Sequence, residues 1–393
     1  MRMLHTADWH LGRTLEGRSR QQEQEAILDE IVTIADKEKV DVILMAGDVY
    51  DSVNPPAASE MLFYETMERL ANKGKRPVVV ISGNHDSPER VQASSPLALS
   101  HGITLVGQPR LDTIQVSVPS VDQSLIVSAI PYPSESRLNE CLSELNEETE
   151  IRAAYDQRLA YLFKTHSKAF RKDTVNLIMS HLFIAGGKES DSERPIQVGG
   201  AYTVTPASLD VGADYVALGH LHRPQTLKFG QTPGRYSGSP LAYSFSEAHQ
   251  SKSVTLIDVN PGMPADIKEI HLSAGRPLVR WNAPNGLEEV QRWIDEGRDK
   301  TAWIDLELTL KDALSIREIQ QLRKAHEGLV HIRPNYILDQ QEAPLERLAD
   351  LPLQDVFGRF YREQTGGAEP DQALVELFLE IAKEAEEEGE GAE

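Results

Sequence analysis

Asn84, His85 and Asp86 follow a short apolar run at positions 77–81 and the turn residue Gly83. The run is rich in β-branched residues and bounded by proline and glycine, as is typical of a buried strand. Glycine permits a sharp turn and a close approach of the backbone at the strand end. An amide oxygen, an imidazole and a carboxylate then stand together at the mouth of a sheet. This combination indicates a metal site or a catalytic site.

The same construction recurs at other predicted strand ends. Apolar stretches that end near residues 7, 46, 180 and 218 are each followed by carboxylate or imidazole side chains. The residues concerned are Asp8, His10, Asp48, Asp51, His181, His220 and His222. In the pairs Asp8/His10 and His220/His222 the side chains are two residues apart, so in an extended chain both members project to the same side. Each pair can therefore face one ion, or two ions about 3.5–4 Å apart.

These side chains offer carboxylate, imidazole and amide ligands but no thiolate. Such a set disfavours structural zinc, which prefers closed cysteine-rich sites, and favours a catalytic binuclear centre of the Mn, Fe, Co or Zn type. Asp48 is the natural bridge, since one carboxylate can offer an oxygen to each ion. Each motif alone is also compatible with an ordinary turn or a surface residue. Their recurrence at five strand ends is what favours the metal site.

The composition is that of a globular chain. Its 393 residues include 40% hydrophobic and 26% charged residues, which suits two or three domains, and a single cysteine, Cys141. One cysteine excludes an internal disulfide and fits a reducing compartment. The N-terminus lacks a signal-peptide layout, and no apolar run approaches the roughly 20 residues of a membrane span. We therefore expect a soluble, cytoplasmic protein without a membrane segment.

The net charge of −21 seen alone argues against a nucleic-acid partner. Its distribution weakens that argument, because residues 135–150 and 380–393 together carry −11 of this charge and are typical of solvated helices or tails. Arginines, by contrast, follow the candidate ligands at positions 13, 90 and 223. Two divalent ions would add four positive charges. A substrate with a phosphate backbone is therefore compatible with the sequence.

The candidate ligands need a scaffold that brings several strand ends together. Apolar residues at helical spacing over 27–35 and 61–72 flank the predicted strands at 42–46 and 77–81. Alternation of strands and helices at these lengths predicts an α/β fold with a parallel sheet, whose carboxyl strand ends are where such sheets bind ligands. Further β runs, expected to form a second, antiparallel sheet layer, lie at 235–237, 253–259 and 267–272.

The pattern changes near residue 274, and the sequence predicts three domains. Residues 1–273 carry the candidate ligands, residues 274–339 form a smaller α+β unit, and residues 340–393 hold a polar linker and a helix–loop–helix. The apolar stripes of these helices include Phe357, Phe360, Leu374 and Phe378. The stripes fit either a hairpin packed on its own body or one that docks on a partner helix or coiled coil. The polar linker and the acidic far end favour docking.

The motifs Asp-x-His, Gly-Asp-x-x-Asp, Gly-Asn-His-Asp, a strand-terminal His and Gly-His-x-His occur in this order. In this respect the chain resembles the calcineurin-like metallophosphoesterases. The resemblance implies a two-layered β-sandwich flanked by helices, and two bound divalent ions, usually manganese. It implies one ion held by Asp8, His10, Asp48 and His222 and a second held by Asp48, Asn84, His181 and His220. It also implies that His85 is a catalytic histidine outside the ligand set, oriented by Asp86. Asp51 stands where relatives often carry His, so its role stays open.

Within that family, the stretches at 7–12, 47–51 and 219–225 are similar to those of bacterial DNA nuclease subunits that act with a coiled-coil ATPase. This resemblance spans the chain. It implies 3′-to-5′ exonuclease activity on double-stranded ends and endonuclease activity on single-stranded or hairpin DNA, in DNA repair, recombination and replication. It also implies a homodimer within a heterotetramer, a DNA-positioning cap at 274–339 and a partner-binding C-terminal hairpin. The chain contains no Gly-x-x-x-x-Gly-Lys-Ser/Thr loop, so any ATP site would belong to a separate chain.

Two other interpretations remain open. A small-molecule nucleotide phosphodiesterase would share the metal site but would leave the unit after residue 274 and the terminal helices without a role. A non-catalytic scaffold on the same fold would be expected to have lost ligands, whereas every ligand position is filled here.

Overall fold

The computed structural model describes residues 1–138, 148–194, 202–263, 265–310, 313–336, 352–365 and 370–390. Cys141 and residues 340–351 of the predicted linker lie outside these ranges. The chain divides into two compact units, and the larger contains Met1–Arg280 with Thr301–Asp305. The smaller contains Trp281–Lys300 with Leu306–Glu393. All predicted metal ligands therefore belong to the larger unit.

The first sheet of the larger unit is mixed. Its strands are, in spatial order, β16 (Asp266–His271), β15 (Ser253–Asp258), β1 (Arg2–Thr6), β4 (Val42–Ala46), β5 (Val78–Ile81) and β6 (Ile103–Val106). β1, β4, β5 and β6 run parallel, whereas β15 pairs antiparallel with both of its neighbours. The crossover helices predicted between the parallel strands are α1 (Gln21–Lys37) and α2 (Ala57–Ala71).

The second sheet is also mixed. Its strands are, in spatial order, β13 (Gln225–Phe229), β14 (Thr232–Tyr236), β12 (Tyr215–Gly219), β9 (Val175–His181), β8 (Gln123–Ile130) and β7 (Ile114–Val118). The four inner strands run parallel, and β13 and β7 close the edges antiparallel. The register places Gly219 beside His181, so two ligand-bearing strand ends are adjacent.

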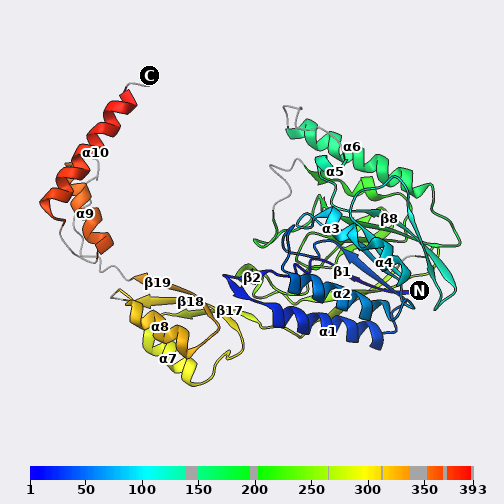
Figure 1. The fold of residues 1–393 in the computed structure, drawn as a ribbon, viewed down its shortest axis with the longest axis horizontal. Coiled ribbons are helices and arrows are strands. Elements are labelled where there is room, and N and C mark those ends of the chain that lie inside the picture. The colour runs from blue at the N-terminus through cyan, green and yellow to red at the C-terminus, as the bar shows by residue number, and fades with distance from the viewer. Residues whose placement is uncertain are drawn as a thin grey trace. The chain divides into compact units, whose positions relative to one another are not determined.

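Apolar side chains form layers that alternate with the period of two expected for strands. In β1, Leu4 faces the core beneath α1 and α2, whereas Met3 faces the core between the two sheets. On the other side of the second sheet, Ile178 packs with Leu159 and Phe163 of α6 (Glu148–Ser167). The arrangement is a two-layered β-sandwich flanked by helices, which confirms the predicted fold class (Figure 1).

Short elements occupy the loops around this sandwich. They are β2 (Thr14–Leu15), β3 (Arg18–Ser19), α3 (Pro88–Ala93), α4 (Ser95–Ser100), α5 (Glu135–Leu138), β10 (Phe183–Ile184), β11 (Thr203–Val204) and the 3-10 turns η2 (Pro206–Leu209) and η3 (Phe245–Glu247).

The structure corrects one prediction about the sheets. The sequence pattern places 235–237, 253–259 and 267–272 together in the second sheet, but only the first of these segments overlaps that sheet, in β14. β15 instead pairs with β1, where Leu256 faces the helix-side core and Ile257 faces the core between the sheets. A strand with two apolar faces suits an interior position in either sheet. Periodicity alone therefore does not decide which sheet receives it.

The strand and helix pattern predicted after residue 274 is present. It consists of β17 (Leu278–Ala283), α7 (Leu287–Asp295), β18 (Trp303–Leu310), α8 (Ile316–Ala325) and β19 (Leu329–Tyr336), with the strands in the order β17-β18-β19. Trp281 is buried and meets the rings of Trp293 and His326 edge to face. Ser315 and Glu318 form a capping box at the start of α8.

Two helices follow, α9 (Leu353–Thr365) and α10 (Gln372–Glu390). The rings of Phe357 and Phe378 stack with their centroids 4.2 Å apart, which joins the two helices into a hairpin. None of the helices in the described ranges is both long enough and apolar enough to cross a membrane.

Candidate metal centre

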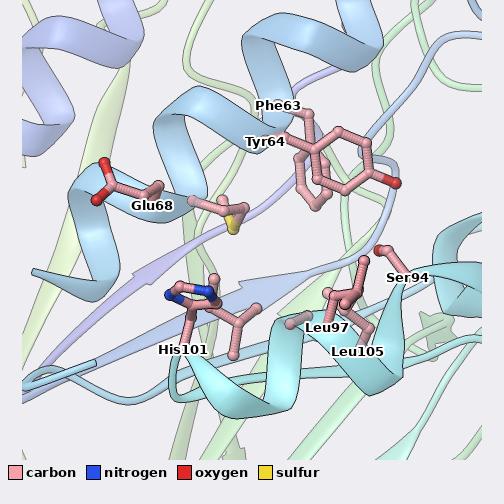
Figure 2. A pocket seen from close by; sticks show the side chains of 10 residues that line it. Phe63, Tyr64, Glu68, Ser94, Leu97, His101 and Leu105 are labelled. Carbon is pink, nitrogen blue, oxygen red and sulfur yellow. The ribbon is translucent and has the colours of Figure 1, made fainter. Parts of the chain in front are cut away.

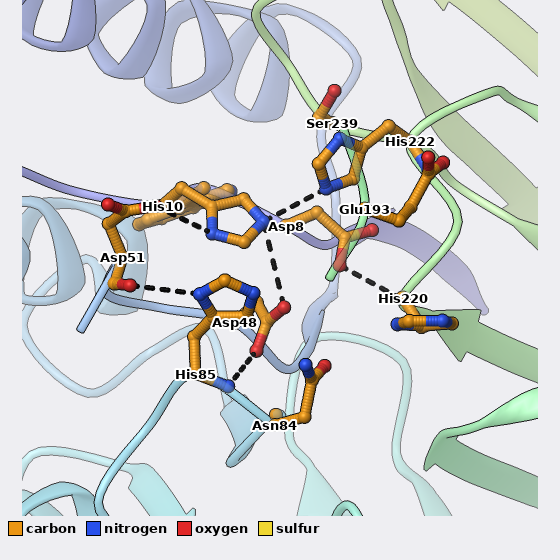
Figure 3. A network of polar contacts seen from close by, with 12 residues as sticks. Asp8, His10, Asp48, Asp51, Asn84, His85, Glu193, His220, His222 and Ser239 are labelled. Carbon is orange, nitrogen blue, oxygen red and sulfur yellow. Dashed lines mark hydrogen bonds and ion pairs between the residues drawn. The ribbon is translucent and has the colours of Figure 1, made fainter. Parts of the chain in front are cut away.

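The predicted ligands lie where the carboxyl ends of the two sheets meet (Figure 3). Asp8 and His10 follow β1, Asp48 follows β4 and Asn84 follows β5 of the first sheet, whereas His181, His220 and His222 come from the ends of β9 and β12 of the second. Hydrogen bonds join the two sheets at this edge. His181 Nδ1 contacts the Ala46 carbonyl at 2.9 Å, and the backbone N–H of His220 donates to Asp8 Oδ1 at 2.9 Å. Residues 212 positions apart in the chain thus face one another.

Several of these residues have a left-handed backbone conformation. The φ angle is 56° at Asp8, 44° at His10, 51° at Asp48 and 105° at His220. Each such conformation costs about 1–3 kcal/mol and persists only where the surrounding structure holds it, and such residues cluster at functional sites. The strained turns direct side chains toward the edge where the sheets meet, which a purely structural loop does not require.

Asp8, His10 and His222 form the first cluster of potential metal ligands. His10 Nε2 and His222 Nε2 lie 3.0 Å apart. Two ligand atoms that are each about 2.1 Å from one ion, at an angle near 90°, have that separation. Asp8 is fully buried, and its Oδ2 has no hydrogen-bond partner among the described residues. A buried polar atom without a partner is costly, and a cation at this position would satisfy it.

Asp8, Asp48 and His181 form the second cluster. Asn84 joins it, because its Oδ1 lies 2.9 Å from His181 Nε2. The Ala46 carbonyl can only accept a hydrogen bond, so His181 carries a proton on Nδ1 and in its neutral form has a lone pair on Nε2. That lone pair then faces the side-chain oxygen of Asn84, so two acceptors repel each other. A cation bound by both atoms would remove this repulsion. His220 Nε2 is also buried and, within the described part of the chain, without a hydrogen-bond partner.

Asp48 belongs to the second cluster and also approaches the first. Its Oδ2 is 3.4 Å from His181 Nε2 and 3.6 Å from His10 Nε2, and its Oδ1 accepts a hydrogen bond from the His85 backbone N–H at 2.9 Å. One carboxylate oxygen is therefore within reach of an imidazole from each cluster. This position suits the bridging role predicted for Asp48.

The charges at this site favour a cation beside Asp48. Burial alone would raise the pKa of Asp48, but His181 and the neighbouring imidazoles outweigh burial and hold the pKa well below its ordinary value. Although burial opposes it, the attraction of Asp48 and Asp8 raises the pKa of His181 to about 9. Burial lowers the pKa of His10 to about 3. Without an ion, the positive charge of protonated His181 thus balances the negative charge of Asp48. A bound metal ion would supply this positive charge in place of the proton.

The structure changes the role predicted for Asp86. The Asp86 carboxylate accepts hydrogen bonds from the backbone N–H groups of Gly83, Val49 and Tyr50 at 2.7–3.1 Å. The His85 ring instead hydrogen-bonds through Nδ1 to the backbone carbonyl of Asp51 at 2.9 Å. Asp51 rather than Asp86 therefore orients the imidazole, and Asp86 ties the turn after β5 to the turn after β4. Burial and the charge of Asp48 raise the pKa of Asp86 to about 6, against the backbone donors.

A cavity of about 460 Å³ opens beside the clusters. Its lining is mainly polar and consists of Arg13, Thr14, Asp51, His85, Asp191, Ser192, Glu193 and Arg194. Arg13 Nη1 lies 3.6 Å from Asp51 Oδ1, and its guanidinium stands 5.0 Å from the centre of the Tyr243 ring. The cavity thus places His85, two arginines and three carboxylates beside the potential ligands.

Sequence reasoning missed the residues that surround His222. Ser192 and Glu193 contact it from the loop after β10, and Lys252 Nζ donates to its carbonyl at 3.1 Å. Lys252 is itself paired with the buried Glu247. Neither segment has an apolar period or a ligand motif. One feature of the sequence could have indicated them: the stretch from Gly187 to Arg194 is charged and rich in serine and follows the predicted ligand His181 closely.

The comparisons with known proteins agree with this geometry. Residues 1–224, more than half of the chain, match the family model of calcineurin-like phosphoesterases, and residues 274–365 match the type 5 capsule protein repressor C-terminal domain. The fold and the ligand clusters are those of a metal-dependent phosphoesterase. SbcD, the D chain of the SbcCD nuclease of Bacillus subtilis (strain 168), is 55% identical over 390 residues, which is 99% of this chain and 99% of that protein. The chain therefore belongs to the SbcD family of calcineurin-like phosphoesterases, which confirms the predicted membership.

Two solved structures also align with most of their length. One is TT1561 of Thermus thermophilus, which is 12% identical with a TM-score of 0.37, and the alignment covers 68% of this chain and 98% of that one. The other is a dimetal phosphatase from Danio rerio, which is 14% identical with a TM-score of 0.42, and the alignment covers 70% of this chain and 99% of that one.

Proposed function

We propose that this chain is the metal-dependent nuclease subunit of an SbcCD-type complex and cleaves phosphodiester bonds of DNA. The observation that carries the proposal is a pair of ligand clusters that share Asp8, with Asp48 within reach of an imidazole from each, at the meeting point of the two sheets. The name of the Bacillus subtilis relative supports the substrate, since that protein is a nuclease. We propose 3′-to-5′ exonuclease activity on double-stranded ends and endonuclease activity on hairpin or single-stranded DNA, in repair, recombination and replication.

The residues present fit two divalent ions, for which we propose manganese. Asp8, His10, Asp48 and His222 would hold one ion, and Asp48, Asn84, His181 and His220 the other. The unpartnered Asp8 Oδ2 and His220 Nε2 support this assignment, counted within the described residues. When bound, two such ions lower the pKa of a water, clamp the scissile phosphate and neutralise charge that develops during an in-line displacement.

His85 is the residue of this chain that we propose for proton transfer. Its Nδ1 is held by the Asp51 carbonyl, so Nε2 is the atom that gains and gives the proton. In the protonated form, His85 would donate that proton to the leaving 3′ oxygen, a general-acid role worth about 10²–10⁴-fold. Its ring also lines the cavity beside the clusters.

A phosphodiesterase for small nucleotides is the alternative, since it would use the same site. The purified protein, loaded with manganese, should cleave a hairpin DNA far faster than bis(p-nitrophenyl) phosphate at equal concentration. Preference for the small diester would favour the alternative. A protein that binds no metal and cleaves neither substrate would be a scaffold.

We propose residues 274–339 as a cap that positions DNA, as part of a division into residues 1–273, 274–339 and 340–393. Arg292 and Arg298 support this, because their side chains are 61% and 45% exposed and their carboxylate neighbours are 3.6 Å away. Such cations can contact phosphates. Replacing both with Ala should weaken duplex binding and leave hydrolysis of the small diester unchanged. Equal losses on both substrates would contradict a DNA-positioning role.

We propose that the α9–α10 hairpin binds the coiled-coil ATPase partner, an SbcC-type protein that supplies the ATP site. Of the predicted contact residues, Phe357 and Phe378 stack on each other, whereas Phe360 is 56% exposed. Leu377 and Ile381 are 51% and 55% exposed on α10. Exposed apolar side chains of this kind mark interaction surfaces. Phe360→Glu should abolish co-purification with the ATPase, whereas Glu376→Lys on α10 serves as the surface control.

We propose that two copies of this chain pair through the apolar face between α2 and α4 (Figure 2). A cavity of about 410 Å³ lies there, lined mainly by apolar side chains that include Phe63, Tyr64 and Leu97. Leu97 and Leu99 are 76% and 66% exposed. Such a face buries itself well against a second copy related by a two-fold axis. Light scattering should give a dimer for the wild type and a monomer for Leu97→Glu.

In line with a DNA substrate and a single cysteine, we place the protein in the cytoplasm.

A further inference from the structure

The loop after β10 binds His222 through two side chains. Ser192 Oγ lies 2.6 Å from His222 Nδ1, and Glu193 Oε1 accepts the backbone N–H of His222 at 2.7 Å. Ser192 and Glu193 are 6% and 8% exposed, so both contacts are shielded from water. The ring and the main chain of one predicted ligand are therefore both held by neighbouring residues of a single loop.

The direction of the hydrogen bonds follows from what each group can donate. Ser190 Oγ donates to Glu193 Oε2 at 2.6 Å, because a carboxylate only accepts. Ser190 has no second proton to give, so in the contact of 2.9 Å between the two hydroxyls Ser192 is the donor. Ser192 has then used its own proton, and its contact with His222 Nδ1 requires a proton on that nitrogen.

The result is a closed circuit that begins and ends on His222. The ring N–H donates to Ser192, which donates to Ser190, which donates to the Glu193 carboxylate. The other oxygen of the same carboxylate accepts the backbone N–H of His222. With the proton fixed on Nδ1, the neutral imidazole presents a lone pair on Nε2, the atom that faces His10 Nε2 at 3.0 Å.

We infer that Ser190, Ser192 and Glu193 are positioning residues that fix the tautomer and orientation of His222 for metal binding. This inference rests on the proposed metal centre. Outer partners of ligating histidines have this effect in metal sites, and their loss costs about 10–100-fold in metal affinity or activity. Ser192, Glu193 and Arg194 also line the cavity beside the clusters. The loop that sets the ligand is thus the loop that borders the substrate.

The test measures manganese affinity directly, by calorimetric titration of the metal-free protein. Ser192→Ala should weaken the binding of one of the two ions by about 10–100-fold. Ser192→Thr keeps the hydroxyl and should stay within about threefold of the wild type. Ser208→Ala is the matched control, since Ser208 is a buried serine that donates to the Asp156 carboxylate at 2.6 Å away from these clusters. Ser190→Ala removes a less buried hydroxyl from the same chain of hydrogen bonds and should also weaken manganese binding.

The outcomes separate this inference from the proposed function. Loss of affinity in Ser192→Ala and Ser190→Ala, with rescue by Ser192→Thr, supports the inference. An unchanged affinity in both alanine variants of a wild type that binds two ions overturns the inference alone. Equal weakening in Ser208→Ala overturns it as well, because the effect would then be general destabilisation. A wild type that binds no manganese overturns the metal centre and the inference together.

Discussion

Replacing Gly83 with Ala should disable the metal centre although Gly83 offers no ligand atom. A Cβ at this position would lie 2.0 Å from Asp48 Oδ1 and 2.3 Å from the Asp48 backbone nitrogen. Real Cβ atoms essentially never approach closer than 3.0 Å, so the Asp48 carboxylate must move by about 1 Å. A rotation of the side chain does not suffice, because the backbone nitrogen clashes too. The turn that carries Asp48 has to shift as a whole.

The size of the effect follows from that displacement. A misplacement of about 1 Å in a reacting arrangement can cost about 10²-fold in rate. Because Asp48 belongs to the second cluster and lies 3.6 Å from His10 of the first, we expect a loss of about 100-fold or more in manganese-dependent hydrolysis of bis(p-nitrophenyl) phosphate, together with weaker binding of both ions. The assay pairs steady-state hydrolysis with calorimetric metal titration, and circular dichroism monitors folding.

Gly358→Ala is the matched control for this substitution. Gly358 lies within α9, and a Cβ added there meets nothing within 4 Å. Alanine also favours a helix over glycine by about 1 kcal/mol. The control should retain full hydrolysis and metal binding. If Gly83→Ala folds and stays within threefold of the wild type in both assays, the close approach of the two turns does not set the position of Asp48, and the reasoning fails.

Three further predictions address single side chains. His85→Ala should lose cleavage but keep both ions, since the contact of His85 with Asp48 is made by its backbone N–H; elemental analysis that shows lost metal would contradict this role. Asp48→Ala should remove more metal than His222→Ala, because Asp48 is the proposed bridge between the two ions, and equal retention of two ions in both variants would argue against a bridge. Burial opposes the hydrogen bonds that Arg20 and Trp303 give Glu23, but the bonds dominate and lower its pKa. The stabilisation from Glu23 is therefore complete at a pH above the ordinary pKa of Glu, about 4.3, and is lost as the pH falls through the lower pKa of Glu23 in the folded protein. At pH 7 the wild type should have a higher melting temperature than Glu23→Gln, and this difference should shrink below about pH 4.

The local motifs were sufficient to predict which side chains come together at the site, because each motif couples a buried strand to polar residues at its end. Asp8/His10 and His220/His222 lie directly after β1 and β12, so identifying the strands also located their ends. The parallel order of β1, β4 and β5 followed from the intervening helices. The face-to-face packing of the two sheets, which brings their ligand-bearing strand ends together, entered only through the family resemblance.

Other features depend on contacts that no local pattern encodes. Asp86 follows His85 in the chain, yet its carboxylate bonds to backbone N–H groups 36 and 37 residues away. The Asp51 carbonyl that holds His85 is a backbone group, which any residue type supplies. Ser192 lies 30 residues before His222 in a loop without periodicity. In each case the partner is set by tertiary packing and not by residue type.

The central claim is that the two sheets together build a binuclear centre that cleaves phosphodiesters. Its most direct test is to titrate manganese into the metal-free wild type and to follow hairpin-DNA cleavage at each point of the titration. We expect two ions per chain and a rate that rises with occupancy of the second ion. Full activity with one ion bound per chain, or two ions bound without cleavage, would contradict it.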